Sequence, residues 1–342
     1  MAYTTIDKSS LHFNTKLYSG NATDNTAITG VGFTPSFLWG KNRTDSTNHY
    51  LIDAVRGVTK YIKSQSGAAE ATDTAVLKSF DSDGFTLGDG SLNQSSHTFV
   101  TWNWKANGQG SANTDGSINT TYTSANTTAG FSISLFTGTG SNETVGHGLG
   151  VAPEWVIVKG VNNTGSWTSY HKSLGPTKYM HLSETDAQAT ASSVWNSTAP
   201  TNQVFSVGAG VQSGSGNTYV AYCFAPIKGF SAMGSYTGNG NADGPFIYTG
   251  FKPAFVIVKN ASSTNHWIVL DNKREGYNPQ KYALFPNQTN AETGDYLIDF
   301  TSSGFKVRTA TGALSENGET LIYMAFAEAP LVGSNNVPAN AR

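Results

Sequence analysis

The chain has 342 residues, a formal net charge of −2 and 13 % charged side chains. Phosphate binding needs a basic surface, and the sequence has no basic run, so we expect no nucleic-acid partner. No apolar stretch approaches the roughly 18 residues of a membrane-spanning helix, so we expect no membrane insertion. The single cysteine, Cys223, excludes an intrachain disulfide.

The composition favours an all-β fold. Glycine occurs 37 times, aromatic residues make up 12 % of the chain, and Asn, Ser and Thr are abundant. This mixture is typical of many short strands joined by tight turns. The sequence therefore predicts tandem antiparallel β-sandwiches of the lectin-like or jelly-roll-like kind.

A turn that leads into a short buried strand occurs three times, at residues 32–41, 150–159 and 250–259. Each copy contains a proline and ends on a lysine. An aromatic residue precedes each proline by a constant interval, and Asp53, His171 and Asp271 follow at another. The prolines are Pro35, Pro153 and Pro253, and the aromatic residues are Tyr18, Phe136 and Tyr236. Such constant offsets predict three copies of one structural unit whose prolines superpose, each at the start of an inner strand.

These offsets divide the chain into five parts. We predict a first repeat, a linker with a hairpin arm, a second repeat, a third repeat and a C-terminal tail. Their ranges are 1–105, 106–129, 130–228, 229–330 and 331–342. The hairpin arm is predicted from Asp115-Gly116, a strong turn signal. We expect no regular structure from Ala329 onward.

Two outer repeats share an acidic turn that the middle repeat lacks. Asp53 precedes Arg56 by three residues, and Asp271 precedes Arg274 in the same way. The spacing suits a turn closed by a salt bridge, and a ligand site common to both repeats is the alternative. The middle repeat has His171 instead, which weakens the hypothesis of a shared chemistry.

A second signature, Phe followed by a polar turn, Gly and Phe, predicts a hairpin at 80–85 and at 300–305, with both rings in one core. The middle repeat carries a longer polar segment, 183–201, which includes Trp195. A longer loop on one copy is where a repeat protein can develop a binding surface.

Four segments of the sequence resemble a known protein family. They are residues 113–118, 124–133, 146–153 and 323–328. Together they resemble a repeat family among virion structural proteins of tailed bacteriophages, especially phages of marine cyanobacteria and other marine bacteria. The resemblance extends from about residue 15 to the end of the chain.

The resemblance implies a tail-fibre-like protein of the virion surface, made in the host cytoplasm, with other tail or capsid proteins as partners. It carries over no catalytic residue. Tail fibres usually begin with an adaptor-docking domain and a shaft, whereas the first repeat starts near residue 15. A purely structural decoration or adaptor protein of tail or capsid is therefore the alternative.

No group of residues predicts catalysis. A capsule-depolymerising tailspike, the second alternative, needs two carboxylates across a cleft. The pairs Asp81 with Asp83 and Asp295 with Asp299 are instead expected in turns or in solvent. Histidines lack metal-ligand spacing, and we find no nucleophile elbow or nucleotide-binding loop, so we expect no enzyme activity, metal or cofactor.

A carbohydrate-binding function is better supported than catalysis, because exposed indole rings stack on sugars. Most tryptophans are expected in the core, but Trp195 lies in a polar segment and is predicted to be exposed. We take Trp195, Trp167 and His171 as candidate carbohydrate-binding residues, for a glycan of the host surface.

The expected assembly is a homo-oligomer, with a trimer favoured. Sheet edges must be paired or covered, and association of copies does this. Three repeats in one chain could also form a pseudo-threefold body as a monomer, and the sequence leaves both alternatives open.

Overall fold

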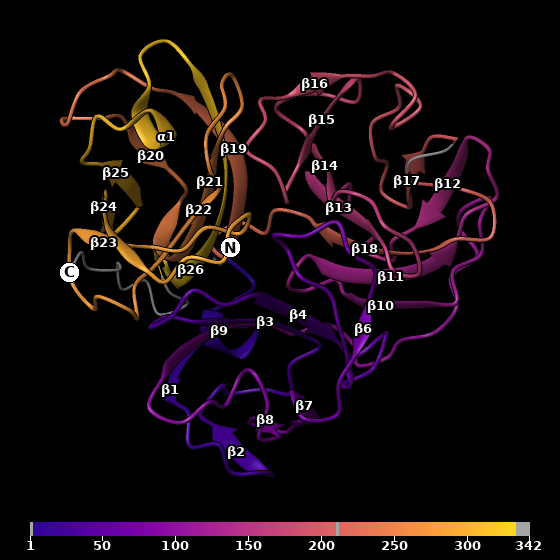
Figure 1. Cartoon of the computed structure of the whole chain (residues 1–342). Helices are drawn as coiled ribbons and strands as arrows, with labels where there is room; N and C mark the ends of the chain where they lie inside the picture. Colours follow the sequence, from indigo (N-terminus) through magenta and orange to yellow (C-terminus); the bar gives the residue numbers. More distant parts are fainter. Residues whose placement is uncertain (1–2, 210–211, 333–342) are drawn as a thin grey trace.

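The computed structural model describes residues 3–209 and 212–332. The fold is all-β, as predicted, and consists of antiparallel sheets in series. Three lobes surround a common centre (Figure 1), with the first repeat in indigo below, the second in magenta at the upper right and the third in orange and yellow at the upper left. Within the described residues, no helix is long and apolar enough to span a membrane.

The first lobe packs a four-stranded inner sheet, in the order β1-β9-β3-β4, against a three-stranded outer sheet, β2-β8-β7. A short hairpin of β5 and β6 and one 3₁₀ turn, η1, complete it. The elements are η1 (Ser9–Leu11), β1 (Phe13–Ser19), β2 (Thr26–Thr29), β3 (Phe37–Asn42), β4 (His49–Asp53), β5 (Lys60–Tyr61), β6 (Ala71–Thr72), β7 (Leu77–Asp81), β8 (Gly84–Leu87) and β9 (Thr98–Trp104).

The second lobe has the same inner sheet, in the order β11-β18-β13-β14, extended by β10 at one edge and by β15 and β16 at the other. Its outer sheet is only the pair β12-β17. The elements are β10 (Tyr122–Asn126), β11 (Phe131–Thr137), β12 (Glu143–Gly146), β13 (Trp155–Gly160), β14 (Thr168–His171), β15 (Lys178–His181), β16 (Ala189–Thr190), β17 (Val204–Val207) and β18 (Thr218–Phe224).

The third lobe repeats the plan, with inner sheet β19-β26-β21-β22 and outer sheet β20-β25-β24-β23. The elements are β19 (Ser231–Thr237), β20 (Phe246–Tyr248), β21 (Phe251–Asn260), β22 (Ile268–Asp271), β23 (Gln280–Ala283), β24 (Thr293–Thr301), β25 (Gly304–Val307), α1 (Gly312–Ser315) and β26 (Thr320–Pro330).

The strand register is identical in the three inner sheets. Phe37 pairs with Trp104, Trp155 with Phe224, and Phe255 with Phe326. Pro35 and Pro153 lie just before β3 and β13, as expected for the start of an inner strand. Pro253 instead lies inside β21, at a register shift, because that strand begins earlier and continues along β26. The common register confirms the repeat interpretation.

Both faces of each inner sheet are buried, and successive residues alternate between two cores. On β13, Trp155 and Ile157 point to a central core, and Val156 and Val158 point to the core of their own lobe. The other inner strands alternate in the same way. This explains the continuous apolar runs in the sequence, because a strand that is buried on both faces has no polar side.

One local prediction is wrong and one holds in part. The segments on either side of Asp115-Gly116 pair antiparallel through Ser111 and Thr123, so the chain turns back there as predicted, but the pairing is a single bridge. Ile118 within this turn bridges to Val145 and buries its side chain in the second lobe. β26 extends to Pro330, so the irregular tail does not begin at Ala329. Residues 333–342 lie outside the described residues. The predicted linker supplies β10, which pairs with β11.

Truncation of a buried indole tests the shared core. Trp155→Ala should lower the free energy of unfolding by about 3–5 kcal/mol, because it leaves a large apolar cavity. Chemical denaturation measures this value. The control is Tyr277→Ala, whose ring is 62 % exposed and which should change stability by no more than about 0.5 kcal/mol. Equal effects of the two changes would contradict the shared core.

Candidate functional site

Trp195 is buried, with 2 % of its surface exposed, so the prediction of an exposed indole is wrong. Gly88 packs against the carbonyl of Ala75, and Gly208 packs in the same way against Ser193. Trp195, two residues after Ser193, therefore takes the core position that Leu77 holds in the first lobe. Among its described residues the second lobe has no counterpart of β7, and this large ring fills the space.

Trp167 is also fully buried, and it joins two lobes. Its Nε1 donates to the carbonyl of Lys63 in the first lobe at 2.9 Å. Trp267 of the third lobe makes the equivalent bond to the carbonyl of His181 in the second lobe, at 3.0 Å. The ring is thus committed to an interface within the chain and offers no face to a sugar.

Backbone hydrogen bonds close the three lobes into a ring. The first lobe donates from Glu70 N to Val161 O at 2.8 Å, and the second donates from Gln188 N to Ala261 O at 2.9 Å. The third lobe donates from Glu292 N to Arg43 O at 3.1 Å. All three acceptors stand two residues after the lysine of the repeated strand. The lobes therefore meet head to tail around a pseudo-threefold axis.

The two acidic turns are closed by salt bridges, which confirms the structural interpretation. Asp53 Oδ2 lies 2.6 Å from Arg56 Nε, and Asp271 Oδ2 lies 2.6 Å from Arg274 Nε. Each Oδ1 accepts backbone N–H groups of its own turn. All four charged side chains are almost completely buried, so these pairs are part of the interior.

Each buried carboxylate also bonds a neighbouring lobe. Tyr222 donates its hydroxyl hydrogen to Asp53 at 2.7 Å, and Trp102 Nε1 donates to Asp271 at 3.0 Å. Tyr222 and Trp102 occupy the same position on β18 and β9, four residues after the threonine that starts each strand. The acids therefore connect the lobes as well as closing their own turns.

His171, the third candidate carbohydrate-binding residue, occupies in the second lobe the position that Asp53 and Asp271 hold in the other two. The equivalent position on β26 is Met324, which has no hydrogen to donate, so a buried carboxylate would lack its partner. His171 replaces the acid, its Nδ1 accepts the N–H of Ser173, and Nε2 lies 3.4 Å from the carbonyl of Tyr323. Burial lowers its pKa to about 4. The side chain is 1 % exposed, so it cannot reach a surface glycan.

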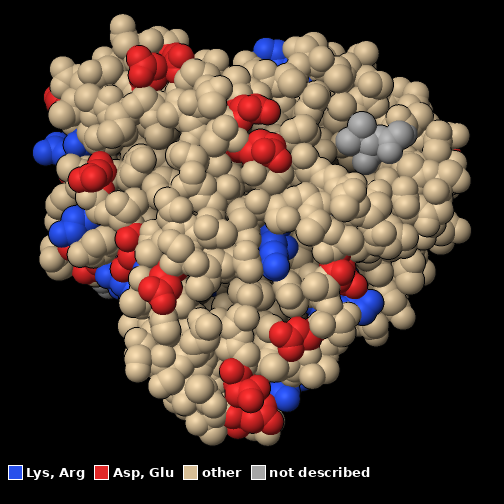
Figure 2. Space-filling model, in the orientation of Figure 1, with Lys and Arg blue, Asp and Glu red and all other residues tan. Residues whose placement is uncertain are grey.

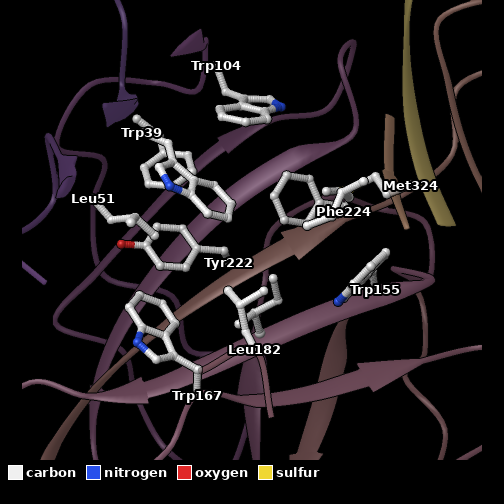
Figure 3. A pocket seen from close by; sticks show the side chains of 12 residues that line it. Trp39, Leu51, Trp104, Trp155, Trp167, Leu182, Tyr222, Phe224 and Met324 are labelled. Atoms are coloured by element: carbon white, nitrogen blue, oxygen red, sulfur yellow. The ribbon is translucent and has the colours of Figure 1, made fainter. Parts of the chain in front are cut away.

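Side chains of all three lobes surround a small cavity at the centre (Figure 3): the first two lobes supply its aromatic rings, and the third supplies Ile257 and Met324. Four tryptophans line it together with Tyr222, Phe224 and apolar residues. Its volume is about 10 Å³, close to that of one water molecule, and its lining is apolar. It is the centre of the core and has no room for a ligand.

Three of the four carboxylates considered for catalysis are occupied locally, and the fourth, Asp295, is exposed on β24. Asp81 accepts hydrogen bonds from Ser79 and Thr86, and Asp83 accepts the N–H groups of Gly30 and Gly32. Asp299 pairs with Arg308 at 3.4 Å. Within residues 3–209 and 212–332, no group of three His, Cys, Asp or Glu side chains could hold a metal ion.

Exposed aromatic rings occur side by side on β20. Phe246 is 48 % exposed and Tyr248 is 60 % exposed, and Ile247 between them is buried. Because residues two apart point to the same side of a strand, both rings lie on the outer face of the third lobe. The aligned positions are Ala27 and Thr29 on β2, and Thr144 and Gly146 on β12. Only the third lobe presents aromatic rings at these positions.

Tyr3 and Lys228 extend this surface, which we call the β20 aromatic strip (Tyr3, Lys228, Phe246, Tyr248). The Tyr3 hydroxyl donates to Gly250 O at 2.7 Å, and Lys228 Nζ lies 4.6 Å from the Tyr3 ring centre. Burial and a hydrogen bond with Tyr248 raise the pKa of Tyr3 to about 12. A signal for the strip was present in the sequence, since Phe246 and Tyr248 alternate with an apolar residue, but the prediction of exposed rings rested on tryptophans alone.

A family profile described as a domain of unknown function, DUF7483, matches residues 8–330. The chain belongs to this family. No curated protein matches the sequence significantly. The match spans all three lobes, so one DUF7483 domain comprises the whole ring.

The lysine that ends each repeated strand of this DUF7483 domain is buried. Lys41, Lys159 and Lys259 each donate Nζ to the carbonyl of the following residue. Their side chains lie on the face of the inner sheet that carries Phe37, Trp155 and Phe255, at the end of the central core. Burial lowers the pKa of each amine to about 8.

These lysines predict a stability profile. Between about pH 8 and the unfolded-state pKa of 10.5, the unfolded chain binds more protons than the folded chain, so the free energy of unfolding should rise with pH. We expect a rise from about pH 7.5 to 9.5, below the range where unfolded tyrosines ionise. Urea denaturation at each pH measures it.

Lys41→Met is the matched variant, because it removes one of three equivalent amines. The rise of its free energy of unfolding with pH should have about two thirds of the slope measured for the unchanged protein. A flat profile of the unchanged protein, or a slope that Lys41→Met leaves intact, would contradict the buried-amine explanation.

Proposed function

We propose that the protein is a non-enzymatic surface protein of a tailed-phage virion that binds a host-surface glycan through the β20 aromatic strip. The resemblance to phage structural proteins supports the location. The exposed rings of Phe246 and Tyr248 support the binding activity, and they are the single observation that carries it.

The strip has the chemistry that sugar recognition needs. Exposed aromatic faces stack on the C–H faces of pyranose rings, and hydrogen-bonding groups at the border hold the hydroxyls. On the neighbouring strand, Lys306 pairs opposite Phe246 and bonds Asp243 at 2.7 Å. Asp243 is largely exposed and has further acceptor capacity.

The face of the molecule shown in Figure 2 carries separate charges of both signs, mainly at its left, centre and bottom, and no continuous basic area. A neutral or weakly charged ligand fits such a surface better than a polyanion does. The absence of a continuous basic area on the face shown favours a glycan over a nucleic acid as the partner.

The double variant Phe246→Ala/Tyr248→Ala tests the binding activity. Binding to an array of bacterial surface polysaccharides should fall at least tenfold, because both stacking faces are lost, and the melting temperature should stay within a few degrees. Tyr277→Ala, another exposed ring of the third lobe, is the control and should bind normally.

Absence of any glycan binding by the unchanged protein would favour a decoration or adaptor role. Reducing ends should be measured in the same incubations. A steady, protein-dependent rise would favour the depolymerase alternative and refute a non-enzymatic function.

The homotrimer remains a prediction, and the pseudo-threefold ring supports the monomer alternative. Each lobe already meets two others through the contacts described, so threefold closure needs no second copy. We propose a monomer in isolation. Light scattering should give a mass near 36.2 kDa, whereas a mass three times larger at micromolar concentration would restore the trimer.

A further inference from the structure

The outer edge of the inner sheet differs among the three lobes. In the second lobe, β10 covers the edge of β11, with Tyr122 opposite Leu135 and Asn126 opposite Phe131. In the first lobe, β1 pairs with β9 alone among the described strands, and in the third lobe β19 pairs with β26 alone. In the part of the chain that the structure describes, two of the three edges therefore have no covering strand such as β10.

The free edge of β1 presents backbone groups at defined positions. His12 O accepts from Lys105 N, and Gly20 N donates to His97 O, so the even-numbered residues of β1 face β9. In an antiparallel ladder the odd-numbered residues then direct N–H and C=O away from the sheet. Leu17 is one of them. Its counterpart Leu135 accepts a bond from Thr121 N, next to β10, at 2.7 Å.

A groove follows this edge, between β1 and the 271–274 turn of the third lobe. It consists of two adjoining cavities of about 290 Å³ and about 50 Å³ that share Asn14, Thr15 and Lys273. Thr15 is 6 % exposed, and its Oγ1 has no hydrogen-bond partner among the described residues. A buried hydroxyl without a partner costs free energy, so a ligand that supplies the bond gains affinity.

The larger cavity of the groove is positively charged. Lys16 and Lys273 line it without an acidic residue, and neither forms an ion pair at hydrogen-bond distance within the described parts of the chain. The smaller cavity is also lined by Glu328, whose carboxylate bonds Asn272 and lies 3.4 Å from Lys252. Asp83, which interacts electrostatically with Lys16, accepts the N–H groups of Gly30 and Gly32.

Neither lysine has a charged counterpart in the other lobes. The positions aligned with Lys16 are Ser134 and Gly234, and those aligned with Lys273 are Val55 and Ser173. The positive charge is thus specific to the β1 edge, and the uncovered β19 edge does not have it.

We propose that the β1 edge is a docking site for an extended acidic segment of another polypeptide, which pairs antiparallel with β1 as β10 pairs with β11. The backbone of Thr15 and Leu17, which line the larger cavity, supplies the hydrogen bonds, and Lys16 and Lys273 select carboxylates. This is an attachment surface, independent of the β20 aromatic strip, and it does not depend on glycan binding.

Two labelled ten-residue peptides test the site, one alternating threonine with glutamate and the other alternating threonine with lysine. Fluorescence anisotropy at low salt should show binding of the glutamate peptide, at least tenfold tighter than the lysine peptide. Hydrogen exchange should show new protection at the amides of Thr15 and Leu17. Equal binding of both peptides, or binding of neither at millimolar concentration, would overturn the proposal.

Leu17→Pro blocks the edge, because proline removes an outward N–H that the β1–β9 ladder does not use. It should abolish peptide binding. The matched control is Ser235→Pro, at the aligned position of β19, which should bind normally. If Leu17→Pro fails to fold, the double charge reversal Lys16→Glu/Lys273→Glu replaces it and should weaken binding at least tenfold.

Light scattering distinguishes docking of another polypeptide at the β1 edge from self-association of this chain through the same edge. If the unchanged protein is a dimer that Leu17→Pro converts to a monomer, then the edge is a self-association surface and the proposal is wrong. A monomer that binds the glutamate peptide supports it.

Discussion

The structure depends on one constraint, which is that each inner sheet is apolar on both faces. An ordinary β-sandwich covers one face of a sheet with a second sheet and leaves the other face in water. Here the second face also carries large side chains, such as Trp102, Trp155 and Phe255. No lobe can bury this face alone. Three lobes solve the problem together, because their second faces form one aromatic core around the axis.

An apolar core does not specify which lobes are neighbours, and the polar contacts do. Tyr222 and Trp102 each donate a hydrogen bond to a buried acid on the adjacent lobe. A misplaced lobe would leave a buried carboxylate without one of its hydrogen bonds, which costs more than the bond itself contributes. At the remaining junction, Met324 offers no donor and His171 replaces the acid. The residue that breaks the repeat pattern therefore matches its partner across the interface.

The features that the lobes share fit the lobes together into the ring, and the proposed binding surfaces lie at positions where the lobes differ. The strand register and the buried lysine recur in all three lobes, and the acidic turn recurs in two, because each lobe must fit the next. Phe246 and Tyr248 on β20, and Lys16 on β1, have no counterparts of the same chemistry. These positions are at the outer sheet and the sheet edge, where substitutions leave the shared core intact. A pseudo-threefold chain can thus carry a different surface on each lobe, which an assembly of identical copies cannot do.

The sequence by itself determined the all-β class, the three repeats and the salt-bridged turns. Each of these follows from local spacing, and the identical strand register reflects the constant offsets around Pro35, Pro153 and Pro253. Only the tertiary structure decided which aromatic rings are exposed. Trp195 lies in a polar segment, yet it fills the core position of a missing strand, and Trp167 is buried by a different lobe. Phe246 resembles a core residue in sequence but faces outward. Burial of a ring depends on what packs over it, and those neighbours come from distant parts of the chain.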